Sequence, residues 1–256
     1  MGSRKEYHPD PGMLTVPLVL HRVTDSPVAF EDISTATFRF ILHHVADCWT
    51  TFEPPGKASE GCQKRWLLTF DDGYSSDFET VFPLLQNAGA QAVFFPIVQA
   101  MGTPGHLTWE QAREMCHHGM MFGSHGLSHA RMTRLGHEEA FRELRASRLE
   151  LEDRLGVAIR AFSFPYGDYS RVLATLAMEA GYETCCTSEH GTVRLPAPLV
   201  PRNSVNSTMK AVAVRRTLDI PPMTRLGWCV EDALKGAAKK LLGEKGYYSL
   251  RGIVCR

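Results

Sequence analysis

The sequence predicts a single α/β domain with a mainly parallel sheet, either open or closed into a barrel. The chain has 256 residues, a length that one α/β barrel can occupy. Short apolar runs alternate with segments of helical periodicity, which is the pattern of consecutive βα units. No internal repeat and no linker rich in Gly, Ser or Pro divides the chain. These three observations together favour one layered or barrel-shaped domain.

The strands are predicted where apolar residues form short uninterrupted runs, as in sheets that are buried on both faces. Six runs have this character: residues 16–20, 66–70, 92–97, 120–123, 161–164 and 184–187. Active sites of parallel α/β sheets and barrels gather at the carboxyl ends of the strands. We therefore expect chemistry in the loops that follow these runs.

The helices are predicted from apolar residues at helical spacing and from their start and stop signals. The clearest helix covers residues 137–155, where leucines recur on one face and Gly156 ends the pattern. A second begins near Thr108, because Gln111 three residues later completes a capping box. Four further helices are expected over residues 35–46, 78–88, 170–180 and 230–242.

Composition narrows the function classes. The 28 Lys and Arg residues equal the 28 Asp and Glu residues, so no net field attracts nucleic acid. The longest apolar stretches fall far short of the roughly 20 residues that cross a bilayer, so no transmembrane segment is expected. The first 13 residues lack the apolar core of a secretory signal, which predicts a cytoplasmic protein. Seven cysteines without a Cys-x-x-Cys pair are expected to be mostly buried thiols in a reducing compartment, without a disulfide framework.

Two adjacent carboxylates, Asp71 and Asp72, follow the run that ends at Phe70. An Asp-Gly turn with no further role is one interpretation, because Gly73 comes next. Two carboxylates in one pocket also repel each other unless a cation is bound nearby. A simple turn and a metal site are therefore two alternative interpretations of these adjacent carboxylates.

Two imidazoles, His125 and His129, stand four residues apart after another predicted strand. Both can reach one ion at bonds of about 2.0–2.1 Å. With one of the two carboxylates they supply three ligands and leave positions open for water and substrate, as catalytic metal sites require. The other carboxylate is then free to act as a base. The same ligand types also describe the facial triad of non-haem Fe(II) oxygenases, although an adjacent base favours hydrolysis.

A third strand end carries the turn Pro165-Tyr166-Gly167. Proline and glycine here are typical of a tight turn. In a pocket, the same turn presents an aromatic face to a sugar ring and backbone N–H groups to a developing oxyanion.

These residues resemble the polysaccharide deacetylases of carbohydrate esterase family 4, also called the NodB-homology domain. The resemblance covers roughly residues 16–205 and depends on three ordered motifs, at residues 69–73, 124–129 and 164–167. It implies a distorted (β/α)₇ barrel and metal-dependent removal of an N-acetyl group from an amino sugar. It also implies Asp71 as general base, with Asp72, His125 and His129 as metal ligands. By the same resemblance, Tyr166 supplies an oxyanion-binding backbone N–H.

Two features depart from the family pattern. Many members carry an arginine where this chain has Ser163, and a Leu-x-x-His motif near the end that is not found here. Residues 18–23, at the first strand, resemble the Tyr-His-x-Ile motif of the branch that includes biofilm-exopolysaccharide deacetylases, in which a first-strand histidine donates the proton. His21 is therefore expected to be the general acid. Arg202 either orients Asp71 in place of the missing arginine or forms an ordinary ion pair.

The resulting expectations concern the domain plan, the cation and the substrate. Residues 1–15 are expected to be a tail, residues 16–205 the barrel, and residues 206–256 a helical extension packed on it, with peripheral membrane contact as an alternative. Zn²⁺ is the expected ion, with Co²⁺, Ni²⁺, Mn²⁺ and Fe²⁺ as alternatives. Pro165, Tyr166 and Arg202 are expected to bind an N-acetylated amino sugar, linked to a nucleotide or lipid. A non-catalytic carbohydrate-binding protein on the same scaffold stays open as an alternative.

Overall fold

The computed structural model describes residues 13–45, 47–52, 57–58 and 62–224, and beyond them residues 226–228, 230, 234, 237 and 241. Its centre is a parallel sheet in which β1 (Leu14–Leu20) pairs with β6 (Lys64–Asp72) over seven residues. β6 continues the sheet to β7 (Val93–Pro96), and β7 to β8 (Met121–Phe122). On the other side, β12 (Asn203–Ser204) pairs in parallel with β1.

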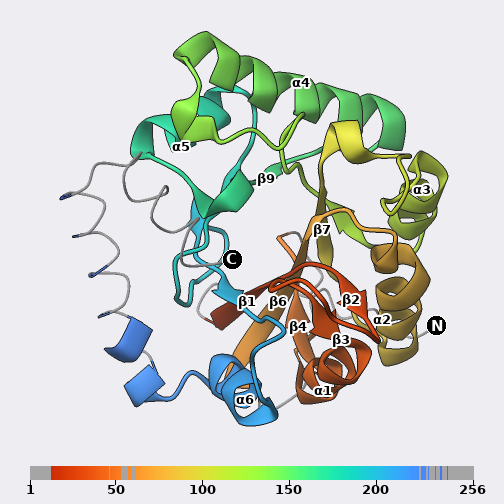
Figure 1. Ribbon diagram of the computed structural model, residues 1–256, viewed down its shortest axis with the longest axis vertical. Coiled ribbons are helices and arrows are strands. Elements are labelled where there is room, and N and C mark those ends of the chain that lie inside the picture. Colours follow the sequence, from red (N-terminus) through yellow and green to blue (C-terminus); the bar gives the residue numbers. More distant parts are fainter. Residues whose placement is uncertain are drawn as a thin grey trace, which may run out of the picture.

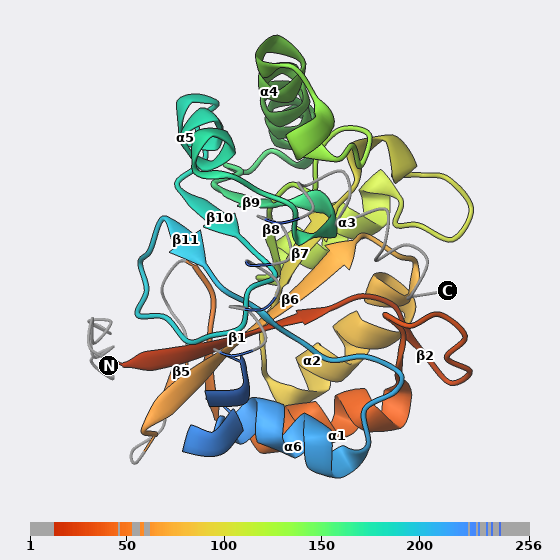
Figure 2. The same ribbon diagram turned by 60° about the vertical axis from the view of Figure 1, so that its left-hand side comes forward.

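A second parallel sheet completes the wall of the fold. It contains β9 (Ala161–Ser163), β10 (Thr184–Cys186) and β11 (Leu199–Val200). A parallel bridge between Ser124 and Phe162 joins the end of β8 to β9, and the chain passes directly from β11 to β12. The two sheets therefore follow each other in one curved, mainly parallel wall (Figure 2), the arrangement of the expected distorted (β/α)₇ barrel. The predicted fold class is confirmed.

The helices lie on the outside of the strands (Figure 1). They are α1 (Thr35–Val45), the π-helix η1 (Asp77–Val81) continued by α2 (Phe82–Ala88), α3 (Trp109–His117), α4 (His137–Leu155), α5 (Arg171–Glu179) and α6 (Ala211–Asp219). The capping box of Thr108 and Gln111 is formed at the start of α3. Gly156 ends α4 with φ of 70°, a left-handed conformation that glycine adopts without strain.

The sequence does not predict the short elements, because a segment of two or three residues cannot show a hydrophobic period. They are β2 (Val23–Thr24), β3 (Ile33–Ser34), β4 (Cys48–Thr50), β5 (Lys57–Ala58) and the 3₁₀ turns η2 (Val98–Ala100), η3 (Met132–Arg134) and η4 (Pro165–Gly167). The core is dominated by large apolar side chains from the strands, among which Phe70 and Phe94 stack with ring centres 5.1 Å apart. This packing fixes the strand ends that carry the polar residues.

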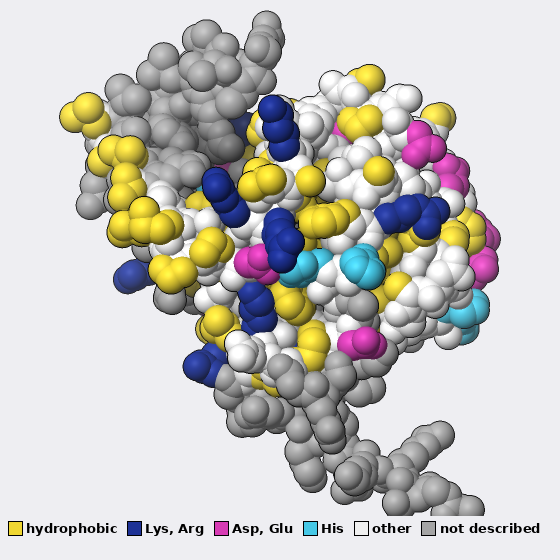
Figure 3. Space-filling model, turned by 90° about the horizontal axis from the view of Figure 1, so that it is seen from below, with side chains coloured by type: hydrophobic (Ala, Val, Ile, Leu, Met, Phe, Trp, Pro, Cys, Tyr) yellow, Lys and Arg dark blue, Asp and Glu magenta, His cyan; other side chains and the backbone are white. Residues whose placement is uncertain are grey.

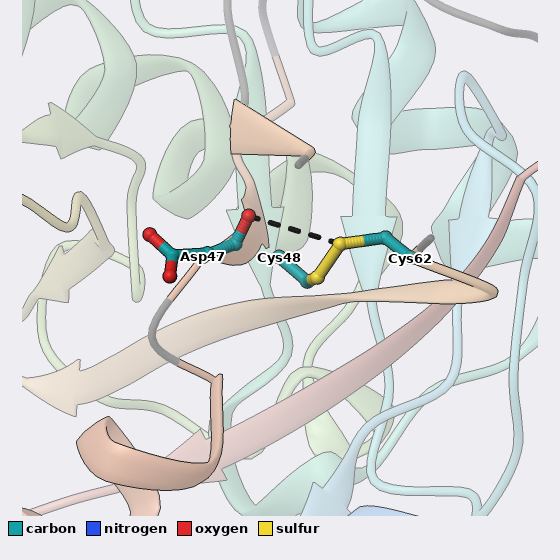
Figure 4. Close-up of a disulfide and its surroundings, with 3 residues drawn as sticks. All are labelled: Asp47, Cys48 and Cys62. Carbon is teal, nitrogen blue, oxygen red and sulfur yellow. Dashed lines mark hydrogen bonds between the residues drawn. A yellow bond between two sulfur atoms is a disulfide. The ribbon is translucent and has the colours of Figure 1, made fainter. Parts of the chain in front are cut away.

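A disulfide between Cys48 and Cys62 corrects the expectation that the cysteines are thiols. The two residues are 14 positions apart with their Cα atoms 6.1 Å apart, within the range that a disulfide spans (Figure 4). Residues 48 and 62 come together because β4 pairs in parallel with β6, a tertiary relation that cysteine spacing alone does not reveal. The thiols of Cys116, Cys185 and Cys186 are free, whereas residues 229 and 255 lie outside the described residues.

The packing of residues 206–256 on the barrel stays a prediction, because most of residues 225–256, including most of the expected helix over 230–242, lie outside the described residues. α6 contacts α1, and its Val214 and Leu218 side chains are buried. Further along, the Leu234 and Leu241 side chains are 65% and 86% exposed. Ile220, which follows α6, is left-handed with φ of 47°. Hydrophobic side chains lie among Lys and Arg side chains on one face of the molecule (Figure 3). No helix among the described residues has the length and apolar character that spanning a membrane requires.

Candidate metal centre and active site

Four loops bring the predicted site residues to the carboxyl ends of the strands. His21 follows β1, Asp71 and Asp72 end β6, the loop after β8 carries both histidines, and η4 follows β9. Asp72, His129 and Tyr166 have φ of 76°, 60° and 61°. Such angles are costly for residues with a Cβ and persist only where the surroundings enforce them. Unfavourable backbone geometry is therefore concentrated at this edge of the sheet.

Asp72, His125 and His129 form a group whose ligand atoms lie within 4.8 Å of one another. Asp72 Oδ1 is 3.5 Å from Nε2 of each histidine. Four tetrahedral ligands at about 2.1 Å from a zinc ion are about 3.4 Å apart, so this spacing fits one cation. Asp72 Oδ1 is also buried and has no hydrogen-bond partner among the described residues. A buried carboxylate oxygen without a partner is costly, and a cation at this point would remove that cost.

Neighbouring groups orient these three side chains. His125 Nδ1 lies 2.9 Å from the Ser163 carbonyl oxygen, which directs Nε2 toward Asp72. Burial, followed by the charge of the nearby Asp72 carboxylate, raises the pKa of Tyr74 to about 12. Burial, followed by the adjacent His125, lowers the pKa of His129 to about 4. His129 is therefore neutral at pH 7, the form in which imidazole binds a metal.

Asp71 is held by a buried arginine, Arg202, which immediately precedes β12, two strands along the sheet from β6. Arg202 donates from Nη1 to Asp71 Oδ1 and from Nη2 to Asp71 Oδ2, both at 2.7 Å. Its Nη2 also donates to the Ser163 hydroxyl at 2.7 Å, and that hydroxyl donates to Asp71 Oδ2 at 3.0 Å. Burial would raise the pKa of Asp71, but Arg202 and, more weakly, His125 hold it well below the usual range. Asp71 is therefore ionised throughout the neutral pH range.

His21 and Tyr166 border the same site. His21 contributes to the electrostatic environment of both Asp71 and His129, and its Nδ1 is buried without a hydrogen-bond partner among the described residues. The Tyr166 ring is centred 4.5 Å from the His129 ring, and the residue is 48% exposed. Pro165, which begins the turn, is buried beneath it. The arrangement offers an aromatic surface beside the candidate metal ligands.

Several polar residues of this site carry no signal in the sequence. Glu143 of α4 accepts hydrogen bonds from the backbone N–H groups of Leu127 and Ser128, which fixes the loop between the two histidines. Asp77 is fully buried, and neither of its carboxylate oxygens has a hydrogen-bond partner among the described residues. Burial, followed by Asp72 and Asp71, raises its pKa well above the usual range. Only the folded arrangement brings these groups to the site, since they lie in helices at no motif spacing.

Sequence comparison relates this chain to the polysaccharide deacetylases. The family described as polysaccharide deacetylase matches residues 58–185. Among curated proteins, the Bacillus subtilis protein YxkH, whose name places it among polysaccharide deacetylases, is 32% identical over 135 residues, or 53% of this chain and 47% of that protein. The chain thus spans about half the length of this relative.

Solved structures share the fold. The Streptococcus pyogenes deacetylase PplD, determined in complex with acetate, gives a TM-score of 0.70 at 19% identity, covering 80% of this chain and 98% of that one. IcaB from Ammonifex degensii gives a TM-score of 0.67 at 24% identity, covering 80% and 95%. At these identities the likeness concerns the fold alone.

Proposed function

Because the chain belongs to the polysaccharide deacetylase family, we propose that it hydrolyses the N-acetyl group of an amino sugar to acetate and a free amine. The observation that carries this proposal is the buried, unpartnered Asp72 Oδ1 between two imidazole nitrogens, next to a second carboxylate that is held ionised. Family membership supports a hydrolase over an oxygenase that would use the same ligand types. An ionised base beside the ligands supports a catalyst over a purely sugar-binding protein.

Asp72, His125 and His129 would hold the cation, and their two nitrogens and one oxygen suit Zn²⁺, with Co²⁺, Ni²⁺, Mn²⁺ and Fe²⁺ as alternatives. When bound, such a cation supplies Lewis acidity and makes water more acidic. The neutral state of His129 and the orientation of His125 by the Ser163 carbonyl support this role.

The chain's own residues then divide the proton transfers. Asp71 accepts a proton from the attacking water, and Arg202 keeps its carboxylate ionised and in place. The Tyr166 backbone N–H donates to the oxygen that becomes negative when the amide carbonyl is attacked. His21 gives a proton to the departing nitrogen, and Pro165 and Tyr166 line the sugar side. The carbonyl gains the water oxygen and the C–N bond breaks.

The location of the protein in the cell bears on which substrate it meets. Disulfides persist in oxidising compartments, so the Cys48–Cys62 bridge supports a location outside the reducing cytoplasm. The family description points to a polysaccharide as the N-acetylated substrate. The nucleotide- or lipid-linked precursor expected from the sequence is the alternative that the experiment must compare.

The experiment is a measurement of acetate release from N-acetylated sugars in free, nucleotide-linked and polymeric form. We expect release from at least one class, loss of release with a chelator, and recovery on adding Zn²⁺. Asp71→Asn should abolish turnover, whereas Asp25→Asn, at an exposed position, should not. A protein loaded with metal that releases no acetate from any class would contradict the proposal.

A further inference from the structure

A cation lies on the aromatic ring of the residue proposed to bind the oxyanion. The guanidinium carbon of Arg131 is 3.9 Å from the centre of the Tyr166 ring. His129, two residues earlier in the chain, also contacts this ring, with ring centres 4.5 Å apart. One segment therefore places both a candidate metal ligand and a cation against Tyr166.

The same segment holds the other end of the turn. Arg131 Nη1 lies 3.7 Å from Asp168 Oδ2, and the Thr133 hydroxyl donates to that oxygen at 2.7 Å. Asp168 is buried, and its backbone N–H donates to the Pro165 carbonyl across the turn. Residues 131 and 133 thus hold the turn both at the Tyr166 ring and at the residue that follows η4.

The turn needs such support because its backbone is unfavourable. Tyr166 has φ of 61° and ψ of 9°, a left-handed conformation that is unfavourable for a residue with a Cβ. Gly167 is also left-handed, and a Cβ there would lie 2.4 Å from the Ser188 side chain. Without contacts on its ring and its following carboxylate, Tyr166 would relax toward negative φ, which reorients its peptide N–H.

We propose that Arg131 is a positioning residue for the hydrolysis: through the Tyr166 ring and the Asp168 carboxylate it holds the turn so that the Tyr166 N–H points at the reacting carbonyl oxygen. This inference rests on the proposed function. Removing an oxyanion donor outright lowers kcat about 100–1000-fold. Loosening the turn leaves the donor present but misplaced, so we expect a loss of about 10–100-fold.

The kinetic test compares Arg131→Met with Arg134→Met. Methionine keeps an unbranched side chain but removes the charge and the planar group, and Arg134 is an exposed residue of the same segment. We expect Arg131→Met to lower kcat about 10–100-fold, with KM and Zn²⁺ affinity each within about threefold of wild type. Arg131→Lys should give an intermediate kcat, since an ammonium group pairs with Asp168 but has no planar face for the ring. Arg134→Met should match wild type.

A second readout does not depend on activity. The N–H groups of Gly167 and Asp168 donate to Phe164 and Pro165, so their hydrogen exchange, measured in a peptide over residues 162–169, reports on the turn. We expect exchange at least about tenfold faster in Arg131→Met and unchanged in Arg134→Met.

The kinetic and exchange measurements distinguish a failure of this inference from a failure of the proposed function. Unchanged kcat in Arg131→Met overturns the inference, as does a loss explained wholly by weaker Zn²⁺ binding or by less folded protein. If the wild-type protein releases no acetate from any sugar, the proposed function fails. In that case the exchange measurement still decides whether Arg131 holds the turn, and unchanged exchange overturns it.

Discussion

The burial of the ion pair between Arg202 and Asp71 predicts how much the free energy of unfolding falls when one partner is removed. Arg202 is 1% exposed and Asp71 3% exposed, and two 2.7 Å hydrogen bonds join them. Breaking a buried pair by removing one partner costs about 3–5 kcal/mol, because the remaining charge stays buried. Arg202→Met should therefore lower the free energy of unfolding by about 3–5 kcal/mol. For a domain stable by about 5–15 kcal/mol, this is a large fraction of the total.

The double variant Asp71→Asn/Arg202→Met separates the pair from other effects of the substitution. Removing both charges leaves no uncompensated ion, so the double variant should be more stable than the sum of the single losses predicts. We expect a coupling energy of about 2–3 kcal/mol. Arg215→Met is the control, since Arg215 and Asp219 form a pair whose side chains are 69% and 41% exposed, and its loss should cost about 0.5 kcal/mol or less.

The assay is urea unfolding of the metal-free proteins in chelator, so that changes in metal binding do not enter. Activity gives a second check. Without Arg202, burial dominates and raises the pKa of Asp71, so acetate release by Arg202→Met should recover as pH rises. The reasoning is refuted if Arg202→Met costs less than about 1 kcal/mol, or if the cycle with Asp71→Asn shows no coupling.

Three further predictions concern other parts of the molecule. Asp72→Asn should abolish stoichiometric Zn²⁺ binding in calorimetry, and retained binding would remove Asp72 from the ligand set. Burial raises the pKa of Asp32, but hydrogen bonds from Arg22 and from the backbone N–H groups of Ala29 and Val28, with the Arg22 charge, lower it to about 2. About 2 kcal/mol of stability should be present above pH 4 and lost as pH falls toward 2, and thermal unfolding of Asp32→Asn should lack this pH dependence. Cys48→Ser should lower the melting temperature in oxidising buffer by removing roughly 3 kcal/mol, but it should not do so after reduction of both proteins, where a persisting difference would assign the effect to packing.

The parts of the fold that could be predicted are those specified by local pattern. Residues 137–155 form α4 within the predicted bounds, because helical periodicity runs between its start and Gly156. The end of β6 was predictable because a buried strand followed by two carboxylates stands out in the sequence. In contrast, the disulfide of Cys48 and Cys62 depends on the pairing of β4 with β6, which no local pattern encodes.

The candidate site was partly predictable for the same reason. Asp72, His125 and His129 have distinctive residue types at a distinctive spacing, and the structure brings them together. Arg131 and Asp77 carry no such signal, since an arginine after a histidine and an aspartate at a helix start are ordinary in a sequence. The Tyr166 ring that Arg131 contacts lies far along the chain, and the burial of Asp77 beside Asp72 and Asp71 arises only on folding.

Arg202 places a guanidinium group beside Asp71, although position 163, where many family members carry an arginine, is a serine here. A guanidinium affects Asp71 through its distance and direction, and these do not depend on which strand carries it. Here the side chain comes from Arg202, before β12, while Ser163 at the end of β9 donates its hydroxyl to the same carboxylate. Arg202 donates to Ser163 as well as to Asp71, at 2.7 Å in each case. The two positions therefore hold the Asp71 carboxylate together, a relation that the residue type at position 163 alone does not reveal.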